Sequence, residues 1–244
     1  MLLKEFELQF EKVDTANNTT AIIVAAGTAS RMNGIDKQLA NLLGVPVIVH
    51  TIKAFQNSNL INNIIVVTRQ DLVLTIQNLV SEYNLNKVTD IVVGGNNRAQ
   101  SVINGLTNSK DADVVLIHDG ARPLVTNDII ENTVNTAKMY GAAVCAVPVK
   151  DTIKIVDANG LVQNTPNRAS LMAVQTPQCF KTTVLSSAIS QNTQNLDTIT
   201  DDSTFVEMAN GNVYTVMGSY DNIKITTKED LVVAENILKL REGE

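Results

Sequence analysis

Two kinds of apolar pattern alternate along the chain, and together they predict strands interleaved with helices. Short uninterrupted runs of β-branched and small residues are typical of strands buried on both faces of a sheet. Such runs occur at residues 21–24, 63–68, 90–93, 113–117 and 142–147. Between them, apolar residues spaced three and four positions apart predict amphipathic helices at 44–57, 71–83, 97–106 and 127–140.

This alternation predicts an α/β fold in which a largely parallel, twisted sheet carries helices on both faces. In parallel sheets, ligands bind beyond the carboxyl ends of the strands. That rule selects three loops as candidate ligand-binding segments, at residues 25–37, 94–101 and 118–123.

The pattern changes after residue 148. Two short alternating runs surround Asn159 and Gly160, and an Asn-Gly pair between such runs is a strong signal for a β-hairpin. Because few large apolar residues occur here, we expect a hairpin arm at about 148–172 that projects from the domain and packs against a second subunit. Helical spacing returns at 181–190, 201–210 and 228–240, with one more strand at 212–217. Residues 1–19 are expected to form an N-terminal extension, and residues 20–244 a single domain.

Composition narrows the class of protein. Hydrophobic residues make up 44% of the 244 residues and aromatic residues only 4%, so the core must consist mainly of Ile, Val, Leu and Ala. The net charge of −6 disfavours a general nucleic-acid binder, which needs a basic face. No secretory leader pattern or membrane-length apolar run is found, and Cys145 and Cys179 lie among apolar residues as core positions would. These features predict a cytoplasmic protein without a membrane partner.

The loop after the first predicted strand suggests a nucleotide site. Residues 25–30 have no bulky side chain, so their backbone N–H groups could approach a phosphate closely, and Arg31 and Lys37 add two cations. The segment matches neither the Walker A spacing nor the Rossmann glycine pattern. An ordinary strand-to-helix connection is the alternative interpretation.

A second candidate segment, HDGARP at 118–123, follows a predicted strand directly. A carboxylate at the end of a buried strand needs either a cationic partner or a metal ion. Arg122 is close enough in sequence to pair with Asp119, and in a triphosphate site Asp119 would instead help to hold Mg²⁺. We expect His118 to position the loop, because a phosphate nucleophile is already ionised and needs no base.

Two later polar residues also receive local predictions. Thr200 is the expected N-cap of the helix that starts at Asp201. Lys224 lies between Ile223 and Ile225, so it is expected on a strand with its side chain turned to the opposite face.

Taken together, these segments resemble the 2-C-methyl-D-erythritol 4-phosphate cytidylyltransferase family of the non-mevalonate isoprenoid pathway. The motifs that carry the resemblance are AAGTASRM at 25–32, DKQ at 36–38, GGNNRAQSV at 94–102, HDGARP at 118–123, PVKDTIK at 148–154, TPQ at 176–178, TDD at 200–202 and DNIKIT at 221–226. They occur in the family's order and spacing. One departure is Ala29, which replaces the second glycine of the family's phosphate loop.

The resemblance implies a nucleotide-diphosphosugar-transferase-like fold and a homodimer in which each arm reaches into the neighbouring active site. It implies CTP and 2-C-methyl-D-erythritol 4-phosphate as substrates and Mg²⁺ as cofactor, with the polyol phosphate attacking the α-phosphorus and pyrophosphate leaving. Ribitol 5-phosphate cytidylyltransferase is the alternative within the same fold. A catalytically silent nucleotide-binding protein is disfavoured, because the four expected cations are all present.

The resemblance also assigns residues. Arg31 and Lys37 would stabilise charge at the α-phosphorus, whereas Arg168 and Lys224 would position the polyol phosphate. The residues expected to line the nucleotide and polyol sites are Ala25, Ala26, Gly27, Gly95, Ser101, Asp119, Arg122, Thr152, Thr176 and Thr200, with Asp119 also the expected metal ligand.

Overall fold

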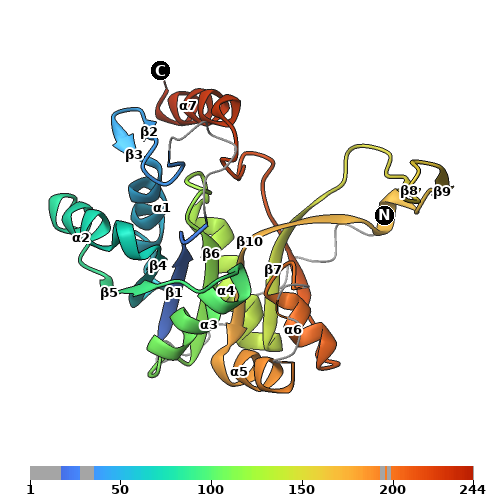
Figure 1. Ribbon diagram of the computed structural model, residues 1–244, viewed down its shortest axis with the longest axis horizontal. Helices are drawn as coiled ribbons and strands as arrows, with labels where there is room; N and C mark the ends of the chain where they lie inside the picture. Colours follow the sequence, from blue (N-terminus) through green and yellow to red (C-terminus); the bar gives the residue numbers. More distant parts are fainter. Residues whose placement is uncertain (1–17, 28–35, 193–195, 197–198, 244) are drawn as a thin grey trace.

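The computed structural model describes residues 18–27, 36–192, 196 and 199–243, and its centre is a seven-stranded sheet (Figure 1). The strands lie in the order β11-β7-β10-β6-β1-β4-β5. All pairings are parallel except those of β10, which runs antiparallel to both β6 and β7. Their bounds are β1 Thr19–Val24, β4 Asn63–Thr68, β5 Val88–Val93, β6 Val114–Asp119, β7 Ala142–Pro148, β10 Met172–Lys181 and β11 Tyr214–Met217. The predicted α/β class with a mostly parallel sheet is confirmed.

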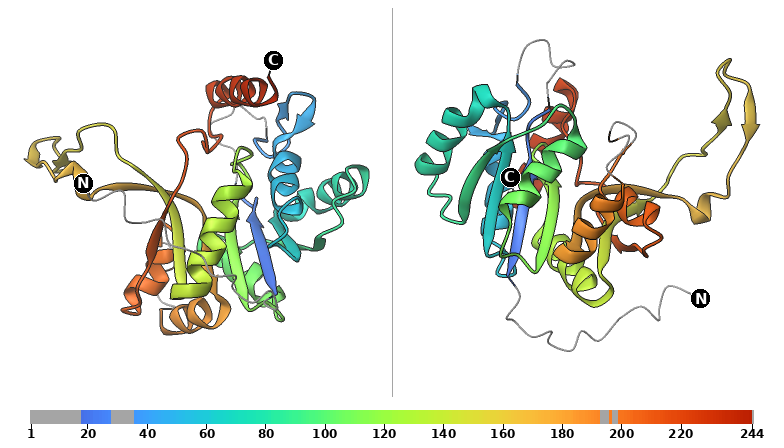
Figure 2. Two further views of the ribbon diagram at one scale, coloured as in Figure 1. Left: turned by 180° about the vertical axis from the view of Figure 1, so that it is seen from behind. Right: turned by 60° about the horizontal axis from the view of Figure 1, so that its bottom comes forward.

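Helices cover both faces of the sheet, as the strand composition predicted (Figure 1, Figure 2). One face is covered by α1 (Val47–Gln56), α2 (Val73–Glu82) and α4 (Asn127–Tyr140), and the other by α3 (Arg98–Asn108), α5 (Thr182–Gln191) and α6 (Ser203–Met208). Successive side chains of a strand point to opposite faces, so Ala21 and Ile23 of β1 join one core while Ile22 joins the other. Both faces of the central strands are therefore apolar.

Smaller elements complete the fold. The helix α7 (Lys228–Glu242) packs over a third cluster that contains Leu42, Val47 and Leu124, next to the short hairpin of β2 (Asn41–Leu42) and β3 (Val45–Pro46). Single 3₁₀ turns occur at η1 (Gln70–Leu72) and η2 (Arg168–Ser170). None of the described helices is both long and apolar enough to cross a bilayer. Cys145 and Cys179 are free and buried, as expected for core positions.

The central strand β10 was not predicted from the sequence. Its apolar run is interrupted at residues 175–178, where Gln175, Thr176, Pro177 and Gln178 follow one another. Its pairing with β7 shifts register between Val174 and Gln178. A proline is unusual inside a central strand, and this irregular stretch accommodates it.

Two local predictions were wrong. The described segment 221–226 forms no strand, although the predicted alternation holds: Ile225 is buried and its N–H donates to the Ala121 carbonyl at 2.8 Å, while the Lys224 side chain points the other way. Thr200 is exposed and does not cap α6. Instead, the Asp201 carboxylate accepts the N–H of Thr204 at 3.1 Å, because Asp201 is closer to the start of the helix.

The predicted hairpin arm is confirmed. Strands β8 (Ile155–Val156) and β9 (Val162–Asn164) pair antiparallel, and the arm projects away from the sheet (Figure 1, Figure 2). Gly160 adopts a φ of +83° in the connecting turn, which suits the glycine of the Asn-Gly pair. Of the expected N-terminal extension, residues 1–17 lie outside the described part of the chain, and Thr19 already belongs to β1.

Candidate functional site

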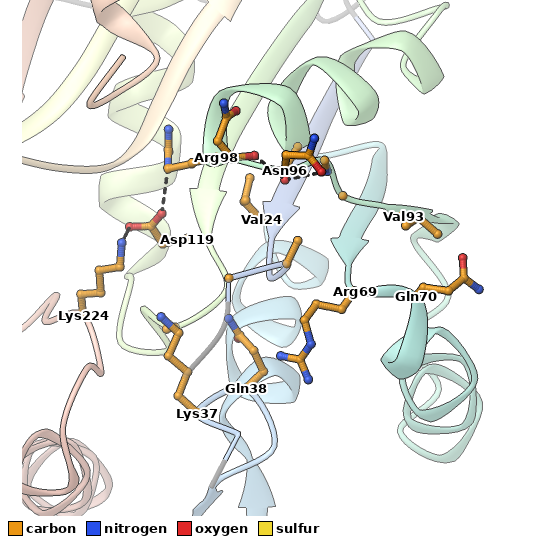
Figure 3. Close-up of a pocket in the computed structure, with 17 residues that line it drawn as sticks. Val24, Lys37, Gln38, Arg69, Gln70, Val93, Asn96, Arg98, Asp119 and Lys224 are labelled. Atoms are coloured by element: carbon orange, nitrogen blue, oxygen red, sulfur yellow. Dashed lines mark hydrogen bonds and ion pairs between the residues drawn. The ribbon is translucent and has the colours of Figure 1, made fainter. Parts of the chain in front are cut away.

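A pocket of about 490 Å³ opens at the carboxyl ends of β1, β4, β5 and β6 (Figure 3). This volume is typical of small-molecule sites. The described parts of all three loops selected from the sequence contribute to its lining, together with Arg69 after β4 and Lys224 before α7. The pocket therefore lies where a parallel sheet is expected to bind its ligand.

Small residues allow the loop after β1 to lie against the loop after β5. A Cβ atom added to Gly94 would collide with the Ala26 side chain and with Ser101 Oγ. Ser101 Oγ in turn accepts the N–H of Gly95 at 3.1 Å and donates to the Asn97 carbonyl at 2.9 Å. The glycine pair after β5 is thus required by close approach, and it leaves one side of the pocket formed largely by backbone.

Asp119 lies at the end of β6 with three cations around its carboxylate. Lys224 Nζ is 3.0 Å and Arg122 Nε 3.3 Å from Oδ2, and Arg98 Nε is 3.5 Å from Oδ1. Burial opposes ionisation of Asp119, but Lys224, Arg98 and Arg122 outweigh this and hold the pKa of the carboxyl well below its usual range. The predicted pairing of Asp119 with Arg122 is present, within a larger network than the sequence indicated.

Arg98 is fixed by a second carboxylate, which the sequence did not identify as part of the site. Its two terminal nitrogens lie 2.8 and 2.7 Å from the oxygens of Asp202, which is fully buried. Gln178 supports this pair from behind, because its Oε1 accepts the backbone N–H of Asp202 at 3.0 Å. A bidentate pair holds the guanidinium plane firmly, so Arg98 is kept directed toward Asp119.

His118 holds the loop in place and is unsuited to take up a proton. Its Nε2 lies 3.1 Å from the Arg122 carbonyl and its Nδ1 3.1 Å from Thr176 Oγ1, which also accepts the Asp119 N–H at 3.0 Å. Nε2 therefore carries the proton and Nδ1 accepts. Burial lowers the pKa of His118 to about 4, so the ring is neutral near pH 7. These contacts agree with the expected positioning role.

The turn that carries Lys37 is attached to the end of β4. The carboxylate of Asp36 accepts the Gln38 N–H at 2.8 Å and contacts Arg69 Nη1 at 2.6 Å, and Arg69 Nε lies 3.0 Å from Asp71. Lys37 and Gln38 rise from this turn toward the pocket (Figure 3). The ion pairs fix the turn and so limit where the Lys37 ammonium can reach.

The structure sorts the predicted site residues into four groups. Those that line the pocket are Ala26, Gly27, Lys37, Gly95, Ser101, Asp119 and Lys224. Ala25, Arg122 and Thr176 lie beside it, buried or in contact with Asp119. Thr152, Arg168 and Thr200 are exposed and do not line it. Arg31 lies outside the described residues.

A magnesium site depends on Asp119, because it is the only carboxylate among the described residues that line the pocket. No group of three or more potential metal-ligating side chains occurs in the described part of the chain. Mg²⁺ in nucleotide sites commonly takes one or two carboxylates and completes its shell with phosphate oxygens and water. The donor set therefore fits an ion held mainly by a triphosphate, with Asp119 as its protein contact.

The functional candidates missed from the sequence are Arg98, Asp202, Arg69 and Gln38. Asp202 and Gln38 stand inside the TDD and DKQ motifs, so their positions were marked but their roles were not. Arg98 and Asp202 are 104 residues apart, and only the tertiary fold brings them together. Arg69 directly follows the predicted strand at 63–68, and this position after a parallel strand was the one signal that could have identified it.

Comparison with known proteins gives a consistent result across the chain. The family model described as 2-C-methyl-D-erythritol 4-phosphate cytidylyltransferase matches residues 19–240. The protein of that name from Clostridium novyi (strain NT) is 46% identical over 221 residues, which are 90% of this chain and 96% of that protein. The one from Alkaliphilus oremlandii (strain OhILAs) is 46% identical over 232 residues, covering 94% and 98% of the two chains.

Solved structures show the same similarity. The crystal structure of 4-diphosphocytidyl-2C-methyl-D-erythritol synthase from Anaerococcus prevotii DSM 20548 superposes with a TM-score of 0.82 at 31% identity, and covers 93% of this chain and 100% of that one. The 2-C-methyl-D-erythritol 4-phosphate cytidylyltransferase of Francisella tularensis has a TM-score of 0.75 at 31% identity, and covers 89% and 98% of the two chains.

Proposed function

The chain belongs to the 2-C-methyl-D-erythritol 4-phosphate cytidylyltransferase family, and we propose that the pocket at the carboxyl ends of β1, β4, β5 and β6 is its active site. The protein is a nucleotidyltransferase of the non-mevalonate isoprenoid pathway that transfers CMP from CTP to 2-C-methyl-D-erythritol 4-phosphate. The observation that carries the proposal is the convergence of Lys37, Lys224 and Arg98 on one pocket beside a loop of small residues.

The charges of the reactants explain this arrangement. Both substrates are polyanions, and their phosphates must approach within bonding distance for the in-line transfer. Catalysis of such a step consists mainly of positioning and charge stabilisation, because the attacking phosphate oxygen is already ionised. No covalent intermediate or general base is needed, which agrees with the neutral, fully bonded His118 ring.

We assign the two lysines to opposite sides of the transfer. Lys37 lies next to the loop that contains Gly27 and would contact the triphosphate, whereas Lys224 approaches from the segment before α7 and would contact the polyol phosphate. The ion pair of Lys224 with Asp119 holds the ammonium at the pocket before substrate arrives. When bound with the triphosphate, Mg²⁺ would neutralise further phosphate charge, with Asp119 as its protein contact.

We further propose that the arm completes the active site of a second subunit. Arg168 and Thr152 lie on the arm, and neither lines the pocket of their own chain. The arm also exposes Ile155, Val156, Leu161 and Val162 by 50 to 65% of their surface. A thin hairpin with exposed apolar side chains gains stability by packing against a partner, and a homodimer would place Arg168 and Thr152 at the neighbouring pocket.

Pyrophosphate release tests the substrate assignment. We expect turnover with CTP and 2-C-methyl-D-erythritol 4-phosphate, and little with ATP, GTP or ribitol 5-phosphate. A pocket wall of backbone donors and acceptors leaves buried groups unpaired when the wrong base enters, and such mismatches discriminate strongly. A comparable kcat/KM with ribitol 5-phosphate would favour the alditol phosphate alternative, and equal use of ATP would contradict the nucleotide assignment.

A further inference from the structure

Gln38 is a buried polar residue whose carboxamide oxygen is unpaired within the described part of the chain. Its side chain is 2% exposed, and Oε1 has no hydrogen-bond partner. Within the described residues the carboxamide forms no hydrogen bond at all. Buried polar groups in folded proteins are nearly always paired. Because Oε1 faces Gly120, the Nε2 end of the amide, which also forms no hydrogen bond within the described residues, is the end left for a partner that arrives from outside.

The backbone of Gln38 is already anchored without its side chain. Its N–H donates to Asp36 Oδ1 at 2.8 Å, and its carbonyl accepts the N–H of Ile48 at 2.9 Å. A Cβ atom added to Gly120 would lie 2.9 Å from Gln38 Oε1 and 2.9 Å from the Ile48 side chain. The side chain therefore occupies a close-packed position beside Gly120.

We propose that the Gln38 carboxamide is a substrate-binding group that donates a hydrogen bond to a phosphate oxygen of the bound nucleotide. The inference rests on the proposed function of this pocket. Gln38 follows Lys37 directly and lines the same pocket as Gly27. Its side chain lies on the Lys37 side of the pocket, away from Asn96 and Arg98 (Figure 3). A phosphate offers only acceptors, so it would take the NH₂ end of the amide. A neutral donor there binds an oxygen without adding to the charge that Lys37 supplies.

Three variants test the proposal. Gln38→Met keeps the length and removes both polar groups, whereas Gln38→Glu keeps an acceptor and removes the donor. Thr19→Val is the matched control, because Thr19 is also fully buried with an unpaired Oγ1 but lies at the other end of β1. The measurements are the melting temperature with and without CTP and Mg²⁺, and KM for each substrate.

We expect CTP to bind in the order wild type, then Gln38→Met, then Gln38→Glu, because a carboxylate repels phosphate. KM for CTP should rise about tenfold in Gln38→Met, with KM for the polyol phosphate little changed. The melting temperature without ligand should be equal to wild type or higher in both Gln38→Met and Thr19→Val, and the CTP-induced shift should shrink only in the former.

Two results would overturn the inference. One is an unchanged CTP-induced shift and KM in Gln38→Met. The other is a Gln38→Glu variant that behaves like wild type while Gln38→Met is impaired, since this is the signature of a structural acceptor. If wild-type protein itself shows no CTP-induced shift and releases no pyrophosphate, the proposed function fails, and the inference that rests on it fails too.

Discussion

The carboxylate of Asp119 is surrounded by more positive charge than is needed to neutralise it. Lys224, Arg122 and Arg98 all contact it, and Arg98 is shared with Asp202. Two carboxylates therefore face three cations, and Lys37 adds a further positive charge to the pocket lining, whereas Arg69 is paired with Asp36 and Asp71. This surplus of positive charge would be unfavourable in an empty core site, and it suits a pocket that receives two phosphorylated substrates.

The first prediction concerns Lys37. We expect Lys37→Met to lower kcat by about two to three orders of magnitude with little change in melting temperature, because it removes a charge directed at the transition state. Steady-state pyrophosphate release measures the effect. The exposed Lys181→Met is the control and should remain active, because Lys181 pairs with Val114 at the end of β6 opposite to the pocket. Near wild-type turnover in Lys37→Met would contradict the assignment of Lys37 to the triphosphate. We expect a similar loss of turnover in Arg31→Ala, and this stays a prediction from the sequence because Arg31 lies outside the described residues.

The second prediction concerns pH. The pKa of His118 is lowered by burial from 6.5 to about 4, so the unfolded chain binds a proton at His118 before the folded one does. Its contribution to stability is complete above about pH 6.5 and is lost as the pH falls from there toward 4. Between pH 7 and pH 5 this loss is on the order of 2 kcal/mol.

Urea unfolding of wild type and His118→Gln at both pH values isolates this contribution, because other titrating groups cancel in the difference. The stability gap between the two proteins should narrow at pH 5. A gap that stays constant with pH would show that His118 is not held neutral.

Which residues could be predicted depended on how far apart their partners stand. Asp119 and Arg122 are three residues apart, so their pairing was visible in the sequence. Arg98 and Asp202 are far apart, and nothing in either motif states that they meet. Gln38 could not be identified either, because an unpaired amide is recognised only when its surroundings are known.

At the scale of elements, the pattern of apolar positions predicted the strands of uniform composition and missed the irregular strand β10. The strand β4 and the helix α4 have the predicted bounds, because a pure β-branched run and a clean helical stripe have one interpretation each. β10 contains Gln, Thr and Pro in succession and pairs only where its register allows. Its place in the sheet is determined by its neighbours β6 and β7, which the sequence of the strand itself does not reveal.

The third prediction belongs to the arm as an element. Val156 and Val162 are about half exposed on β8 and β9, and we expect them to be buried against a second subunit. Val156→Thr with Val162→Thr keeps the shape and buries two hydroxyls, at a cost of roughly 1–3 kcal/mol each. The dissociation constant of the dimer should therefore rise, so that the variant becomes monomeric at concentrations at which the wild type is still a dimer. Activity should fall in parallel.

Light scattering over a dilution series measures this change. Val232→Thr with Val233→Thr on α7 is the control, since these two valines are similarly exposed but lie on a different element. If the arm variant and the α7 variant dissociate alike, the arm is not the interface.

At the scale of the whole molecule, one chain presents a pocket and an arm that do not meet. The cations Lys37 and Lys224 line the pocket, while Arg168 lies on the arm and donates to the Lys150 carbonyl at 2.7 Å. In a monomer, Arg168 would therefore not reach the pocket and could not contact a bound substrate. In the proposed two-fold symmetric dimer, each arm would reach the other subunit's pocket and the two sites would be equivalent.

The last prediction tests this exchange with a hybrid dimer. One subunit carries Arg168→Ala in the arm, the other carries Lys37→Ala in the pocket, and two affinity tags allow the mixed dimer to be purified. If arms act on the neighbouring pocket, one of the two sites combines an intact pocket with an intact arm. The other combines both defects. The hybrid should then recover about half of the wild-type kcat, although each parent homodimer is nearly inactive. If the arm serves its own chain, neither site of the hybrid is complete, and activity as low as in the parents would refute the exchange.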